Sequence, residues 1–234
     1  MNFYSHVAIA SLFSEEVGLA LGAMLPDLAS LVGVKPPKSG CTHINRGYSL
    51  HYATDRAFHE LEPFRQASRI ESQRLQSLGV SRGTAMAAAH VGLELVLDDA
   101  LAEDEPTQVL FRSTLAAAAP QALCLSLEWG SATHATRFET LRQRLWTLAM
   151  ERPVDATMLA ERLCRTLANR PRLAVRASDR ESLQRWAAEL PLRCSPIWPN
   201  VIAGVVCALE GTNWHPSPSL SRPLRFRRAW SSEV

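Results

Sequence analysis

Three side chains that can bind a metal ion follow one another at intervals of four residues in the first half of the chain. His51, Asp55 and His59 lie in the stretch Ser-Leu-His-Tyr-Ala-Thr-Asp-Arg-Ala-Phe-His. In a helix, a step of four residues turns by about 40° and rises by about 6 Å, so these side chains share one face. A histidine and a carboxylate placed in this way can hold a single ion. The spacing predicts a metal-binding helix, and the alternative is a helix whose polar groups satisfy one another.

The same spacing recurs at His90, Glu94 and Asp98. The positions between them are Val, Gly and Leu, so this helix is apolar on nearly every side. A buried carboxylate must be paired, neutralised or bound to a metal ion. The apolar setting therefore favours a second metal-binding helix over a set of surface ion pairs.

Two further candidate ligands, His6 and Asp27, lie upstream in apolar segments. Taken alone, His6 fits a hydrogen-bonded core histidine, and Asp27, which follows Pro26, fits a helix cap. Together with the two helices they complete a larger set. Imidazole and carboxylate ligands suit Zn or Mn, or Fe, rather than a thiolate-selective metal. The predicted ligands of one or two such ions are His6, Asp27, His51, Asp55, His59, His90, Glu94 and Asp98.

Eight ligands are enough for two ions, which points to hydrolysis of a phosphate ester. One ion lowers the pKa of a bound water, and the pair stabilises charge on the attacking and leaving oxygens. Among the acids, we expect Asp55 and Asp98 to be essential. Arg46 and Arg56 are candidates to hold the phosphate by bidentate contact, and the alternative for both is a surface arginine.

The order of these motifs resembles that of the acyl carrier protein phosphodiesterase family, an all-helical group related to the HD-domain metal-dependent phosphohydrolases. His6, in the opening Met-Asn-Phe-Tyr-Ser-His-Val-Ala-Ile-Ala, matches the family's early histidine, and Asp27, in Leu-Gly-Ala-Met-Leu-Pro-Asp, matches its first acid. Residues 47–55 are similar to the family's His-x-x-x-Asp helix. Residues 93–101 are similar to its second acidic helix, and both acids of that helix are matched.

This resemblance implies an HD-domain-like helical fold, a divalent metal ion and release of phosphopantetheine from holo acyl carrier protein, which would be the protein partner. The sequence departs from the family at several places. Tyr52 and Ala53 stand where the family carries two arginines, Met86 and Ala87 replace basic residues, and His59 replaces an aspartate. The resemblance therefore extends to the metal ligands more fully than to the residues that would recognise the substrate.

The sequence also resembles the zinc-dependent phospholipase C and single-strand nuclease group, which is all-helical and holds up to three zinc ions. The similarity lies in His6, in residues 22–27 and in the His-x-x-x-acid pairs that begin at His51 and His90. The sequence offers no obvious match to the N-terminal ligand of that group. A third hypothesis is a non-catalytic helical scaffold that retains the fold and uses its acid and histidine cluster for stability.

The chain as a whole has helical periodicity, with no sustained alternation of period two. We predict a single all-α domain over residues 1–211, a helical bundle, followed by a Pro/Ser/Arg-rich tail, 212–234, that is extended or frayed. Proline and glycine mark the boundaries of the expected helices. These are 14–24, 48–67, 68–78, 82–103, 107–118, 135–150, 155–168, 179–190 and 197–210.

Composition excludes several classes of protein. The 25 Lys and Arg residues nearly balance the 23 Asp and Glu residues, which argues against a dedicated nucleic-acid binder. The longest apolar run, 201–209, is about half of what a membrane-spanning helix requires. The five cysteines are scattered and include no Cys-x-x-Cys pair, and the first residues lack the basic region of an export signal. We therefore expect a cytoplasmic protein.

Overall fold

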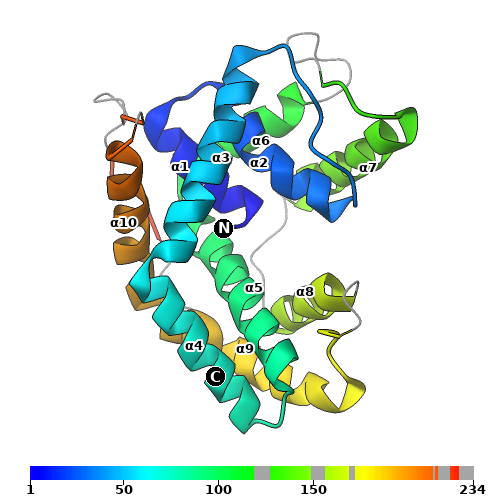
Figure 1. The fold of residues 1–234 in the computed structure, drawn as a ribbon, viewed down its shortest axis with the longest axis vertical. Coiled ribbons are helices and arrows are strands. Elements are labelled where there is room, and N and C mark those ends of the chain that lie inside the picture. The colour runs from blue at the N-terminus through cyan, green and yellow to red at the C-terminus, as the bar shows by residue number, and fades with distance from the viewer. Residues whose placement is uncertain (119–126, 149–155, 169–171, 213, 216–221, 227–234) are drawn as a thin grey trace.

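The computed structural model describes residues 1–118, 127–148, 156–168, 172–212, 214–215 and 222–226 (Figure 1). Within these residues the chain is helical, and its only pairing of extended backbone is an isolated bridge between Lys38 and Glu128. The predicted all-α class is confirmed. The α-helices are α1 (Phe3–Phe13), α2 (Val17–Leu31), α3 (Thr42–Glu60), α4 (Glu62–Ser77), α5 (Arg82–Leu101), α6 (Glu105–Ala117), α7 (Ala132–Leu148), α8 (Ala156–Ala168), α9 (Arg180–Cys194) and α10 (Trp198–Glu210), with short 3₁₀ turns η1 (Ala177–Asp179) and η2 (Ser195–Ile197).

The first two helices differ most from the sequence prediction. The expected helix 14–24 is wrong, because α1 occupies residues 3–13 and α2 runs from 17 to 31. Nearly every residue of α1 from Ser5 to Leu12 is buried, so this helix has no polar face and shows no amphipathic period. α2 continues through Pro26 although proline removes a helical hydrogen bond. Leu28 and Ala29, just beyond it, are fully buried, and their burial favours continuation of the helix.

Two other helix boundaries also differ from the sequence prediction. The break between α3 and α4 falls at Leu61 rather than near residue 67, because Pro63 lies in the first turn of α4, where its missing N–H costs nothing. Pro191 was expected to end α9 at residue 190, but α9 continues to Cys194. The predicted helix ends at residues 150 and 155 lie outside the described residues.

α2 and α3 cross at a pair of glycines with their backbones in contact. A Cβ atom added to Gly22 would lie 2.8 Å from the Cα of Gly47, and one added to Gly47 would lie 2.6 Å from the Cα of Gly22. Real Cβ atoms essentially never approach so closely, so neither position can hold a side chain without moving a helix. This crossing brings the second halves of both helices, which carry Asp27 and His51, next to each other.

α5 runs through the middle of the molecule and packs against α1, α4, α8 and α9 (Figure 1). Gly92 of α5 lies against Trp186 of α9, at a distance where a Cβ would be 2.6 Å from the indole ring. The buried Glu71 of α4 accepts hydrogen bonds from the Trp186 indole (2.8 Å) and from the Arg193 guanidinium (3.0 and 2.8 Å). α4, α5 and α9 are thereby joined into one support behind the predicted ligands of α5.

Part of the predicted tail is anchored to the helical core. Residues 222–226 form no helix or strand, and Leu224 is buried. The Arg222 guanidinium donates to both carboxylate oxygens of Asp104 at 2.6 and 2.7 Å, and it also reaches the Ser11 hydroxyl of α1 at 3.3 Å. Asp104 is fully buried and caps α6 by accepting from the Thr107 amide. Residues 216–221 and 227–234 of the tail lie outside the described residues.

One helical stretch is long and apolar enough to cross a membrane by length and composition alone. It joins η1, α9, η2 and α10 over Ala177–Glu210, and a third of its most apolar window is buried. This is weak evidence for a span, because a core helix of a soluble protein passes the same test. The buried face of α10, which includes Trp198, Val201 and Val205, packs toward α3 and α4. The described residues therefore contain no clear transmembrane segment.

The glycine crossing predicts that Gly47→Ala strongly destabilises the protein. The new methyl group must push α2 and α3 apart, and overpacking of this kind costs about 1–3 kcal/mol. Thermal or urea unfolding followed by circular dichroism measures the effect. Gly40→Ala is the matched control, because a Cβ at Gly40 meets nothing within 4 Å. Equal stabilities of the two variants would contradict the crossing.

The tail contact predicts a pH-dependent stabilisation. Burial by itself would raise the pKa of Asp104, but hydrogen bonds from Arg222, Thr107 and the Arg225 amide outweigh it and hold this pKa below its usual value. The resulting stability is present above the unfolded-state pKa and is lost as pH falls through the folded-state pKa. Arg222→Ala should lower the unfolding free energy by about 3 kcal/mol at pH 7.

The same difference should shrink progressively below about pH 4, as Asp104 becomes protonated. Arg225→Ala is the control, since the exposed Arg225 bonds Asp104 through its backbone amide alone. Unfolding curves of the three proteins at several pH values test this. A loss in Arg225→Ala as large as that in Arg222→Ala would refute the assigned contact.

Candidate metal centre

Four helices bring the predicted ligands together. α1 carries His6, α2 carries Asp27, and α3 and α5 carry three candidates each, on the faces that the four-residue spacing predicted. Figure 1 shows the N-terminus at the place where α1, α3 and α5 meet. Six of the eight side chains form two groups, in each of which one ligand atom per residue lies within 4.8 Å of the others. The first group is His6, Asp27 and His51, and the second is His59, His90 and Glu94.

Asp55 adjoins the first group. The Nε2 atom of His6 lies 3.4 Å from Oδ1 of Asp55 and 3.8 Å from Oδ2 of Asp27, and Nε2 of His51 lies 4.0 Å from Oδ2 of Asp55. The imidazole rings of His6 and His51 have their centres 4.1 Å apart. Two imidazoles and two carboxylates therefore face a common point between α1, α2 and α3.

The position of His51 fixes which of its nitrogens is free. Its Nδ1 atom lies 2.8 Å from the carbonyl oxygen of Ala23, and because a carbonyl only accepts, Nδ1 carries the proton and donates it. The Nε2 atom of a neutral His51 then has a free lone pair, directed toward Asp55. Metal-binding histidines are oriented by just such a hydrogen bond to the backbone. Because the Gly22 and Gly47 crossing sets the distance between α2 and α3, it also sets this bond.

Several polar atoms of the first group are buried without a partner. Both ring nitrogens of His6 and the Oδ2 atom of Asp27 have no hydrogen bond, although they are inaccessible to solvent. Buried polar groups are almost always paired, so unpaired atoms that face each other indicate a missing ligand. Nitrogen and oxygen donors of this kind fit a divalent ion such as Zn or Mn. The residues present therefore fit a metal ion.

The protonation states agree with this interpretation. Burial lowers the pKa of His6 to about 3, so its imidazole is neutral at pH 7 and has a lone pair to share. Burial raises the pKa of Asp27 to about 8, and the negative charges of Asp55 and Glu94 contribute to this rise. Burial would raise the pKa of Asp55, but the nearby His6 and the Met1 ammonium outweigh burial and keep this pKa well below its usual value. The group is thus rich in acid and short of positive charge.

The second group is more accessible than the first. Nε2 of His59 and Nε2 of His90 lie 3.2 and 3.3 Å from the same oxygen, Oε1 of Glu94, and the two rings are stacked with centres 5.0 Å apart. The side chains of His59 and His90 are 35% and 41% exposed. Two imidazoles and one carboxylate match the protein ligands of catalytic zinc sites, which keep a position for water or substrate.

The α-amino group of Met1 lies between the two groups and was not predicted from the sequence. It is 2.6 Å from Oδ1 of Asp55 and 3.3 Å from Oε1 of Glu94. Burial lowers its pKa, but the charges of Glu94 and Asp55 outweigh burial and raise the pKa above its ordinary value. A cation of the protein itself therefore occupies the space between the carboxylates. No local pattern could have indicated this position, because it depends on how α1 packs against α3 and α5.

The remaining predicted residues are not members of either group. Asp98 belongs to neither, and its Oδ1 atom accepts hydrogen bonds from Ser5 of α1. Arg46 lies over the Trp214 ring, 5.6 Å from its centre, on a different side of α3 from His51. Arg56 is exposed, and the described residues include no contact from it to either group. The structure thus brings neither arginine to the candidate metal centre.

Comparison with family models, with curated proteins and with solved structures found no match. The interpretation of the site therefore depends on the geometry of its own residues.

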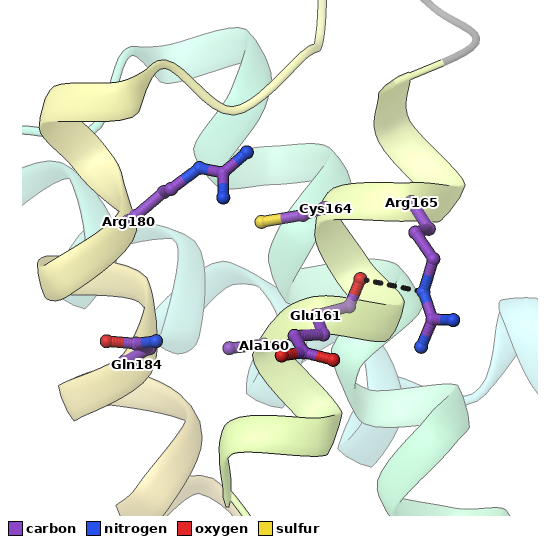
Figure 2. Close-up of a pocket in the computed structure, with 6 residues that line it drawn as sticks. All are labelled: Ala160, Glu161, Cys164, Arg165, Arg180 and Gln184. Atoms are coloured by element: carbon purple, nitrogen blue, oxygen red, sulfur yellow. Dashed lines mark hydrogen bonds between the residues drawn. The ribbon is translucent and has the colours of Figure 1, made fainter.

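A surface cavity of about 330 Å³ lies elsewhere, between α8 and α9 (Figure 2). It shares no residue with the metal groups. Its charges are mixed, and Arg165 turns its guanidinium to the Glu161 carbonyl oxygen at 3.4 Å. We assign no chemistry to this cavity, since its lining residues include no group of side chains that could bind a metal ion. The lining residues are Ala160, Glu161, Cys164, Arg165, Arg180 and Gln184.

The ligand geometry predicts that the purified protein contains at least one divalent ion per chain, measurable by elemental analysis. His51→Ala should lower the affinity for Zn or Mn by at least about 100-fold, the upper limit for loss of an outer-shell partner. His43→Ala is the matched control, because His43 lies on the same helix but is exposed and faces Glu16. Unchanged metal content in His51→Ala would contradict the assignment.

Proposed function

We propose that this chain is a metal-dependent phosphodiesterase or phosphohydrolase whose two ligand groups hold divalent ions, Zn or Mn, or Fe, side by side. The observation that carries the proposal is the set of buried, unpaired atoms on His6 and Asp27, which face Asp55 and His51. The nearby group of His59, His90 and Glu94 supplies a second set of ligands. Paired ions of this kind are typical of enzymes that cleave phosphate esters.

In this proposal the residues of the chain have distinct tasks. His6, Asp27, His51 and Asp55 hold one ion, and Ala23 orients His51 through its carbonyl oxygen. His59, His90 and Glu94 hold the other. When bound, the ions acidify a water molecule and neutralise charge on the phosphate oxygens. The more exposed second group lies where solvent and substrate reach it.

For the substrate we propose a phosphodiester, with the phosphopantetheine ester of holo acyl carrier protein first among the candidates. The support is the order of motifs shared with the acyl carrier protein phosphodiesterase family. Two residues near the candidate site weigh against strong recognition of an acidic partner. Tyr52 and Met86 replace basic residues of that family, and both are more than half exposed. The Tyr52 ring lies 5.2 Å from that of His51. An acidic carrier protein would therefore meet an apolar rim here.

A second candidate is a zinc-dependent phospholipase C-like or nuclease-like hydrolase with up to three ions. The position of the Met1 amino group favours it. The sequence offered no obvious N-terminal ligand, whereas the structure places this amine within 3.3 Å of both Asp55 and Glu94. The raised pKa keeps this amine protonated, so a third ion would have to displace its proton in order to bind between Asp55 and Glu94.

The proposal predicts metal-dependent hydrolysis of bis(p-nitrophenyl) phosphate. Activity should disappear after chelation and return when Zn or Mn is added. Asp55→Asn should abolish this activity, because the amide cannot supply the negative charge between His6 and Met1. Glu60→Gln is the control, since Glu60 is an exposed acid at the end of the same helix.

Holo acyl carrier protein and phosphatidylcholine vesicles then distinguish the two candidate substrates. Release of phosphopantetheine supports the first candidate, and release of phosphocholine supports the second. A protein with neither bound metal nor activity after metal is added would instead fit the non-catalytic scaffold.

A further inference from the structure

The first turn of α1 receives a hydrogen-bond acceptor from another helix. The first amide groups of any helix lack partners within it. α1 begins at Phe3, and its third amide, that of Ser5, donates to Oδ1 of Asp98 on α5 at 2.8 Å. The Ser5 hydroxyl donates to the same oxygen. Asp98 therefore caps a helix that lies 93 residues away in the sequence.

The acceptor oxygen of Asp98 suits this position. The first amides of a helix point out of its N-terminus, so an acceptor placed there satisfies a donor that the helix itself leaves unpaired. One turn earlier on α5, Glu94 lies 3.3 Å from the Met1 amino group. Two acids of α5 thus contact the start of α1 at two points. Together these contacts fix the position of α1 along its own axis and its rotation about that axis. Ser5 itself is completely buried, so water cannot replace Asp98 as its partner.

The rotation of α1 decides where His6 points. Successive residues of a helix are about 100° apart and rise by about 1.5 Å, so a shift of α1 by one residue would turn His6 away from its partners. With Ser5 held on α5, His6 faces α2 and α3, where its Nε2 lies 3.4 Å from Asp55. Ser5 therefore contacts α5, and the next residue, His6, faces α2 and α3.

We propose that Asp98 is a positioning residue that caps α1 through Ser5 and thereby places His6 in the first ligand group, and that Asp98 is not itself a metal ligand. This replaces the prediction from sequence that Asp98 binds the metal. The functional part of the proposal rests on the metal-dependent function proposed above. The capping part does not, because it concerns hydrogen bonds of the protein alone.

The decisive comparison is between Asp98→Asn and Asp98→Ala. Asparagine keeps a carbonyl oxygen that accepts from Ser5, whereas alanine removes the acceptor. In a Co²⁺ titration followed by visible absorption, Asp98→Asn should bind as the wild type does. Asp98→Ala should lose about 10- to 100-fold in affinity at the first group only, the range typical of lost outer-shell partners. His51→Ala and His90→Ala provide reference spectra in which only the second or only the first group binds normally.

Hydrogen exchange of the metal-free protein tests the capping itself. The Ser5 amide should exchange faster in Asp98→Ala than in the wild type, and Asp98→Asn should restore the protection. Ser5→Ala keeps the backbone amide but lacks the hydroxyl, so its residue-5 amide should lose less protection from exchange. This variant replaces Asp98→Ala in the experiment if Asp98→Ala does not fold.

Two results would overturn the proposal. One is a loss of Co²⁺ affinity in Asp98→Asn equal to that in Asp98→Ala, and the other is an unchanged exchange rate of the Ser5 amide in Asp98→Ala. If Asp98→Ala does not fold, an unchanged exchange rate of the residue-5 amide in Ser5→Ala would overturn it instead. If the wild type binds no Co²⁺, the metal-dependent function fails, and with it the placement of His6 for a metal. The exchange experiment then still decides the capping.

Discussion

The backbone contact between Gly22 and Gly47 is the constraint on which the site depends. It brings α2 and α3 closer than helices with side chains at the crossing can come. At this separation the Ala23 carbonyl oxygen lies 2.8 Å from Nδ1 of His51, and a carboxylate oxygen of Asp27 lies within 4.8 Å of a ring nitrogen of His51. The orientation of an imidazole in the candidate metal centre is therefore set by the absence of side chains at Gly22, next to Ala23, and at Gly47, one turn before His51.

The second constraint is electrostatic. Four acids, Asp27, Asp55, Glu94 and Asp98, are gathered where α1, α3 and α5 meet, and burial leaves His6 neutral. The Met1 ammonium offsets part of this negative charge. Burial, together with the neighbouring Glu94, raises the pKa of Asp98 to about 7, against the hydrogen bonds from Ser5. Such a cluster is costly unless cations offset its charge, and this cost is the physical basis of the proposed affinity for divalent ions.

The local part of this arrangement was predictable from the sequence, and the non-local part was not. The pairs His51 with Asp55 and His90 with Glu94 follow from helical spacing, which depends only on neighbouring residues. The position of the Met1 amine and the bond from Ser5 to Asp98 depend on packing between segments that are far apart in the chain. α1 was missed because it is buried all round and so shows no amphipathic period. A separation of five residues turns Arg46 about 140° from His51, so helical spacing gives no reason to group these two side chains.

The anchored tail ties the two ends of the described chain together. Arg222 reaches Ser11 across 211 positions, while Asp104, its main partner, lies near the middle. During synthesis on a ribosome, α1 and α2 emerge long before residues 222–226, and both helices are almost entirely apolar. α1 and α2 can pack against each other and against α3 as soon as α3 is made, but α1 gains its contacts to Asp98 and Arg222 only later. The last contacts of α1 therefore form only after residues 222–226 have been made, so part of its apolar surface lacks its final partners during synthesis, when such surface favours association.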